Sequence, residues 1–194
     1  MAIPEAGRIG ASSLRDAMKH HEVLAAGILS GIAAGIAMMA VGMIAAATQD
    51  VPLLYPLQIV GESFVGPEAL GGVAKVAFGS LVHLLTSAAL GIVFAAIVPR
   101  EFGTTCAMGL GTGITLFAMG VMMSTLVPWA NPGFRGAFQA IGGSWVLAHA
   151  VFGVTLGIAP SLRRWVSREA SGAISDREPV HAQGIKIAST TRTT

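Results

Sequence analysis

Residues 23–49 read VLAAGILSGIAAGIAMMAVGMIAAATQ, a stretch that contains no Asp, Glu, Lys or Arg. A helix needs about 20 apolar residues to cross the ~30 Å hydrocarbon core of a bilayer, so this stretch is long enough to span a membrane. Three more stretches without a charged residue follow at 76–99, 102–134 and 136–162. Unbroken apolar runs predict helices, because the strands of a membrane barrel alternate polar and apolar residues. The sequence therefore predicts an all-α integral membrane protein with four transmembrane helices, near 23–48, 74–98, 103–128 and 142–162.

The composition agrees with this fold class, since only 11% of the 194 residues are charged, against about a quarter in soluble domains. Most basic residues lie on one predicted side of the membrane, where Lys and Arg indicate the cytoplasm. We therefore expect both termini to be cytoplasmic, in the inner membrane of a bacterium, and the loops near 50–72 and 128–142 to face outward. Because topology explains the positive charge, we expect no nucleic-acid partner. The basic residues near the ends of the predicted helices are Arg8, Arg15, Lys19, Arg100, Arg163, Arg164 and Arg168 on the cytoplasmic side and Lys75 and Arg135 on the outer side.

The chain divides into three parts by composition. Residues 1–21 are predicted to be a polar cytoplasmic segment, and residues 22–166 a single four-helix membrane domain. The first apolar run is too long for the core of a cleavable signal peptide, so it is expected to remain as an anchor. Residues 167–194, rich in Ser, Thr and Arg, are predicted to be a flexible cytoplasmic tail. A proline in each outer loop, Pro56 and Pro132, precedes a short piece that is expected to form an interfacial helix.

An internal repeat relates the two halves of the membrane domain. Three glycines of the first apolar run recur in the third at an offset of 78 residues, and the second and fourth runs match at an offset of 66. A two-helix unit has even parity, so both copies share one orientation, and we expect a pseudo-twofold axis along the membrane normal. The matched glycines are Gly31, Gly35 and Gly42 in the first copy and Gly109, Gly113 and Gly120 in the second.

Two histidines occupy matching positions of this repeat. His83 stands eight residues before Gly91, and His149 stands eight residues before Gly157. An ionisable side chain inside a membrane helix indicates a functional site. The repeat predicts that His83 and His149 lie at one depth, in the outer leaflet, on opposite sides of the axis.

Three interpretations of the histidine pair remain open from the sequence. His83 and His149 could be the axial ligands of a haem b, with Lys75 and Arg135 pairing with the propionates, because neutral imidazole is a strong iron ligand. A chlorophyll-type pigment with one histidine on its magnesium is a variant of this interpretation. The histidines could instead be structural residues, bonded to hydroxyls or backbone carbonyls, or they could handle protons or a metal.

Glycines spaced four residues apart mark one face on each of two helices. They are Gly27, Gly31 and Gly35 in the first apolar run and Gly109 and Gly113 in the third. Such faces allow close helix packing in lipid, either within the bundle or at a dimer or partner interface. Seven of the nine methionines fall in the same two runs. Thioethers can bind Cu(I), but packing is the favoured interpretation of these residues.

Sequence signatures of known chemistry are missing. The chain contains no nucleotide-binding loop in a strand–helix context, no HExxH or GxSxG motif and no Asp or Glu inside a predicted span. We therefore predict a non-catalytic subunit of a larger membrane complex, in contact with lipid and with other subunits or further copies of itself. The alternative is an oligomeric channel or small-solute transporter, gated by the two histidines. Its expected lining is Thr86, Ser87, Thr112, Thr115, Ser124 and Thr125.

Overall fold

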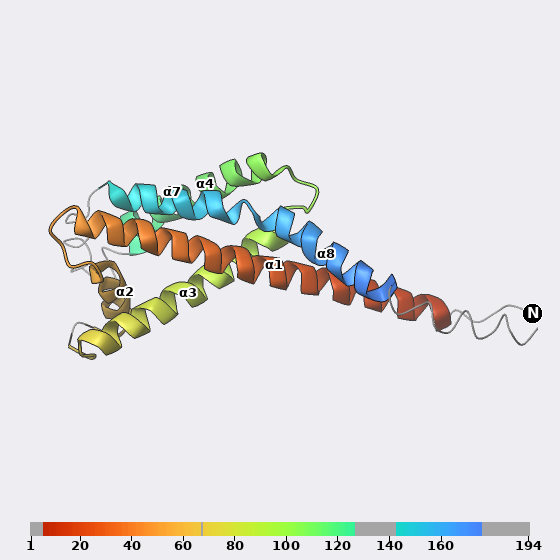
Figure 1. Cartoon of the computed structure of the whole chain (residues 1–194), viewed down its shortest axis with the longest axis horizontal. Helices are drawn as coiled ribbons and strands as arrows, with labels where there is room; N and C mark the ends of the chain where they lie inside the picture. The colour runs from red at the N-terminus through yellow and green to blue at the C-terminus, as the bar shows by residue number, and fades with distance from the viewer. Residues whose placement is uncertain (1–5, 67, 127–142, 176–194) are drawn as a thin grey trace, which may run out of the picture.

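The computed structural model describes residues 6–66, 68–126 and 143–175, and every regular element in these ranges is a helix (Figure 1). Four helical segments are long and apolar enough to cross a membrane: Ala17–Ala47, Gly72–Ile97, Thr104–Thr125 and Ser144–Glu169. These findings confirm the prediction of an all-α chain with four long apolar helices. The elements are α1 (Ala6–Ala47), α2 (Tyr55–Val65), α3 (Gly72–Ile97), α4 (Thr104–Val121), the π-helix η1 (Met122–Leu126), α7 (Ser144–Leu156) and α8 (Ala159–Ser175).

Two helices extend further than the apolar pattern indicates. Helix α1 has 42 residues, about 63 Å at 1.5 Å per residue, so residues 6–21 continue the first apolar helix. At the other end, residues 167–175 of the expected flexible tail belong to α8. The side chain of Ser167 donates a hydrogen bond to Glu22 at 2.6 Å, which joins the two extensions. Mutual packing therefore orders these polar segments, and the apolar pattern does not report such packing.

The fourth apolar stretch is divided into α7 and α8. Gly157 and Ile158 donate to carbonyls three residues earlier, so the last turn of α7 tightens before α8 begins at Ala159. Pro160 lies at the second position of α8, where its missing N–H breaks the helical hydrogen-bond ladder. Pro56 has the same position in α2, a short helix between α1 and α3. The second expected loop helix, near Pro132, lies outside the described residues.

The long helices pack in the order α3, α1, α7, α4, with α3 and α4 on opposite sides of the α1–α7 pair (Figure 1). A short connection at 98–103 joins α3 to α4, yet within the described residues these two helices hardly touch. Helix α2 packs against the N-terminal part of α3, and α8 runs along the N-terminal half of α1. A cluster of buried apolar residues lies near the 98–103 connection, with Phe94, Val98 and Phe152 among its members.

Glycines bring the backbones of neighbouring helices into contact. A Cβ on Gly31 would lie 2.2 Å from the Ser87 carbonyl oxygen, and one on Gly91 would lie 2.1 Å from the Gly27 oxygen. Between α4 and α7, a Cβ on Gly153 would lie 2.5 Å from the Cα of Thr112. Only a residue without a side chain permits these approaches. The pairs α1–α3 and α4–α7 therefore each pack with their backbones nearly touching.

The five glycines singled out from the sequence have two different environments. Gly27, Gly31 and Gly35 face α3, where a Cβ on any of them would lie within 3 Å of an α3 atom. Gly109 and Gly113 have no atom of another described segment within 4 Å of such a Cβ. The close contact of α4 with α7 is made by Gly111 instead, because successive helical residues point about 100° apart and the expected face is turned away from α7.

Candidate functional site

A cavity of about 330 Å³ lies among α1, α2, α3, α4, η1 and α7. Its wall is mostly aliphatic and methionine side chains, and a few polar groups interrupt it. Its size and composition are those of a small-molecule site, which is typically apolar with a few polar groups that orient the ligand. The polar residues of the wall are His83, Thr86, Ser87, Thr115, Ser144, Trp145 and His149.

The structure brings the two histidines to this one cavity. His83 reaches it from α3, and His149 reaches it from α7. The side chain of His83 is half-buried, and His149 is buried. A shared site is therefore consistent with the positions of both residues.

The hydrogen bond of His149 defines its tautomer. Its Nδ1 lies 2.8 Å from the backbone oxygen of Trp145, one turn earlier in α7. A carbonyl oxygen only accepts, so Nδ1 carries the proton and donates it. In the neutral ring Nε2 then has a lone pair, on the side of the ring away from the helix backbone. The Trp145 ring lies beside the imidazole, with the two ring centres 6.2 Å apart.

His83 donates through the other ring nitrogen, Nε2, rather than through Nδ1. Its Nε2 lies 3.2 Å from the backbone oxygen of Gly35 on α1, so Nε2 is the donor and Nδ1 holds the lone pair. This bond depends on the close approach of α1 and α3, since a Cβ on Gly35 would lie 2.6 Å from the Ser87 hydroxyl oxygen. The glycine face of α1 thus positions a carbonyl that orients the His83 ring.

Of the two expected propionate partners, Lys75 is not among the described residues that line the cavity. The ammonium of Lys75 is 2.7 Å from a carboxylate oxygen of Glu62, an ion pair that joins α3 to α2 beyond the cavity. This pair accounts for Glu62, whose partner the sequence does not reveal because the two residues belong to different helices. Arg135 lies outside the described residues.

Methionines gather at the cavity in a way that sequence reasoning missed. Five of the nine line it, from α1, α4 and η1. Their recurrence in two apolar runs was the available signal, but only packing brings the runs together. Cys106 is exposed on α4 and belongs to no such group. The methionines of the cavity are Met38, Met39, Met119, Met122 and Met123.

The cavity opens sideways between α3 and α4. Leu90 and Val93 of α3 and Ile114 of α4 all line it, and each is between 43% and 54% exposed. Since α3 and α4 hardly touch in the described residues, this side of the wall is incomplete. The described residues therefore leave this side of the cavity exposed.

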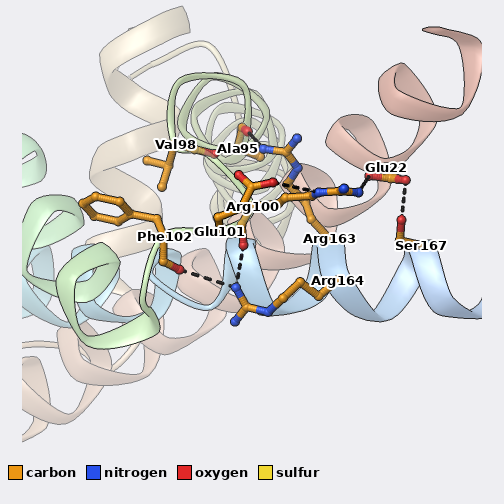
Figure 2. Close-up of polar contacts among 9 residues, drawn as sticks. All are labelled: Glu22, Ala95, Val98, Arg100, Glu101, Phe102, Arg163, Arg164 and Ser167. Atoms are coloured by element: carbon orange, nitrogen blue, oxygen red, sulfur yellow. Dashed lines mark hydrogen bonds and ion pairs between the residues drawn. The ribbon is translucent and has the colours of Figure 1, made fainter. Parts of the chain in front are cut away.

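A cluster of polar side chains, separate from the cavity, joins α8 to the end of α3 near the 98–103 connection (Figure 2). The Arg163 guanidinium of α8 donates to the carbonyls of Ala95 and Val98 at 2.9 and 2.8 Å, which satisfies the C-terminal end of α3. Arg164 donates to the carbonyl of Arg100 in the same connection. These bonds hold α8 against the end of α3 and leave no reactive arrangement.

Two carboxylates, one buried and one exposed, also belong to this cluster (Figure 2). Glu22, buried on α1, accepts from Ser167 and lies 3.9 Å from the Arg100 guanidinium. A hydrogen bond from its own backbone N–H, helped by the neighbouring Arg100, holds the pKa of Glu101 below its usual range. Opposite charges and bonded carbonyls explain the arginines here, so the cluster is structural.

No protein-family description, curated protein or solved structure matches the chain. The fold and site define its class: an all-helical chain with four helices able to span a membrane and a cavity lined by histidine and methionine. Any function must be argued from that cavity.

Proposed function

We propose that the protein is a non-catalytic integral membrane protein that holds an apolar ligand in this cavity, as a subunit of a larger assembly in the bacterial inner membrane. The observation that carries the proposal is the presence of His83 and His149, from different helices, in the wall of one apolar cavity. Each neutral ring donates one N–H to a carbonyl and keeps a second nitrogen that can accept a hydrogen bond. An unsatisfied acceptor in apolar surroundings is costly, so two imidazoles at one cavity favour a bound molecule over an empty space.

Binding is better supported than conduction. Thr112 and Thr125, two of the expected channel-lining residues, donate their hydroxyls to carbonyls of their own helix segment and do not line the cavity. The hydroxyl of Thr115, which does line it, donates to Gly111 at 2.7 Å. The hydroxyl protons of these three threonines are therefore already donated to carbonyls of the chain. The cavity opens toward lipid, which suits an apolar ligand.

The packing of the helices agrees with the proposed repeat in one pair of contacts and departs from it in another. A pseudo-twofold axis that exchanges α1 with α4 and α3 with α7 relates the close pair α1–α3 to the close pair α4–α7. The same axis relates the packed pair α1–α7 to α4–α3, which hardly touch. We propose that the ligand occupies the position of this missing contact, so that one copy of an ancestral helix interface has become a binding site.

The hydrogen bonds support His149 as a haem ligand more than they support His83. A ligating histidine usually donates its second ring N–H to a carbonyl or carboxylate, as His149 donates Nδ1–H to Trp145. The Nε2 of His83 is engaged with Gly35, so ligation through that nitrogen requires the bond to break. The geometry therefore favours a haem or pigment with His149 as its single histidine ligand over one held by both.

Isolation of the full chain in mild detergent tests the proposal. We expect mass spectrometry of an organic extract to find an apolar molecule in stoichiometric amount, and an absorption spectrum to show whether it is a haem or pigment. Ala118 lines the cavity from an exposed face of α4, so Ala118→Trp should displace the ligand with little effect on folding. Leu110→Trp is the matched control, because Leu110 is exposed on α4 away from the cavity. Equal ligand content in both variants would refute the proposal.

A further inference from the structure

We infer that the ligand of this cavity is a lipid-soluble molecule with two hydroxyl donors, the chemistry of a hydroquinone. The inference rests on the proposed function and adds the chemical class of the ligand. It follows from the hydrogen bonds of His83 and His149, which leave each ring with an accepting nitrogen.

The protonation of the two rings leads to this conclusion. A cationic imidazolium is unfavourable in an apolar wall, so each ring is neutral and has a single N–H. His149 donates its N–H to the Trp145 carbonyl, and His83 donates its N–H to the Gly35 carbonyl. Both carbonyls can only accept, so neither ring can reverse its role while these bonds persist. The site therefore offers two acceptors to a ligand and no imidazole donor.

Two imidazole nitrogens that accept hydrogen bonds can distinguish between ligands of similar shape. A hydroquinone has two O–H donors that satisfy both lone pairs. Its oxidised partner, a quinone, has carbonyl oxygens that only accept and would face the lone pairs of His83 and His149 without a proton between them. Leaving buried acceptors unsatisfied costs more than a hydrogen bond contributes, so these two nitrogens favour the hydroquinone over the quinone.

The rest of the wall suits the apolar body of such a molecule. Met39, Met119 and Met123 line the cavity together with aliphatic side chains. Methionine is flexible and polarisable, adapts to irregular shapes and makes favourable contacts with aromatic rings. The opening beside Leu90, Val93 and Ile114 leads into the hydrocarbon phase, so an alkyl or isoprenoid tail can extend there while the ring stays inside.

A matched pair of probes tests the inference: tetramethylhydroquinone and tetramethylquinone, which differ only in two hydrogen atoms. Binding of each to the full-length protein in detergent, freed of extracted ligand, is measured by equilibrium dialysis, anaerobically for the hydroquinone. Two net hydrogen bonds correspond to a preference of about tenfold or more for the hydroquinone. We expect His83→Ala and His149→Ala each to reduce this preference and the double variant to abolish it. Leu85→Ala, which shortens an exposed side chain of α3 that does not line the cavity, should retain it.

The outcomes separate this inference from the proposed function. Equal binding of the two probes, or tighter binding of the quinone, by the unaltered protein overturns the inference and needs no variant to fold. A stoichiometric haem or pigment spectrum in the purified protein also overturns it, while the proposed function stands. If no apolar molecule is extracted and neither probe binds, both fail. A hydroquinone preference that survives the double variant would assign the selection to other residues and overturn the role of the histidines.

Discussion

Substitution of Gly31 by alanine tests the helix packing on which the cavity depends. The new Cβ would lie 2.2 Å from the Ser87 carbonyl oxygen and 2.9 Å from the Cα of Ala88. Ordinary contacts begin near 3.4 Å, so α1 and α3 must separate by roughly 1 Å over this region. Both opposing atoms belong to the backbone and cannot rotate away. We expect a loss of about 1–3 kcal/mol in the free energy of unfolding, the usual range for overpacking.

The matched control is Gly113→Ala on α4, a position with no other described segment within 4 Å of the added carbon. Alanine is favoured over glycine in a helix by up to about 1 kcal/mol, so this variant should be neutral or slightly stabilised. Reversible unfolding in mixed micelles with increasing dodecyl sulfate, followed by circular dichroism, measures both. Equal effects of the two variants would refute the packing described here. Destabilisation by Gly113→Ala alone would mean that the α4 face is the buried one.

Three further predictions concern the polar cluster and the orientation of the chain. Arg163→Gln should lower the free energy of unfolding by about 2–3 kcal/mol in the same assay, because its charged hydrogen bonds to the carbonyls of Ala95 and Val98 are lost. Arg168→Gln is the control and should change this free energy little, because Arg168 is exposed. Because the pKa of Glu101 is depressed in the folded protein, the ionised carboxylate stabilises the fold above its unfolded pKa, and this contribution is lost as pH falls through its folded pKa. A carbon NMR titration should show the pKa of Glu101 rising toward its ordinary value in Arg100→Gln. An unchanged pKa would contradict the contact with Arg100. A thiol in Glu101→Cys, made in a Cys106→Ser background, should react with a membrane-impermeant maleimide only from the cytoplasmic side; labelling from outside would reverse the proposed topology.

Much of the candidate site was predictable from local pattern, and the remainder depends on partners distant in sequence. His83 and His149 stand out because they are ionisable residues at equivalent repeat positions in apolar runs. Their hydrogen bonds to Gly35 and Trp145 determine which nitrogen is available, and only one of these partners, one turn away on the same helix, could be anticipated. The pairing of Lys75 with Glu62 depends on how α2 docks on α3, which no spacing rule gives.

The sequence by itself determined that the chain has four long apolar segments and that they are helical, because the length of an apolar run and the absence of charge decide membrane insertion locally. It did not determine which face of each helix meets a neighbour. Lipid tails and protein interior are equally apolar, so hydrophobicity does not distinguish Gly31, packed on α3, from Gly113, which faces away from every other described segment. The tertiary structure decided this, and with it the separation of α3 from α4 that forms the cavity. The physical reason is that helix association in a membrane depends on close fit between particular surfaces, which exist only once the helices are assembled.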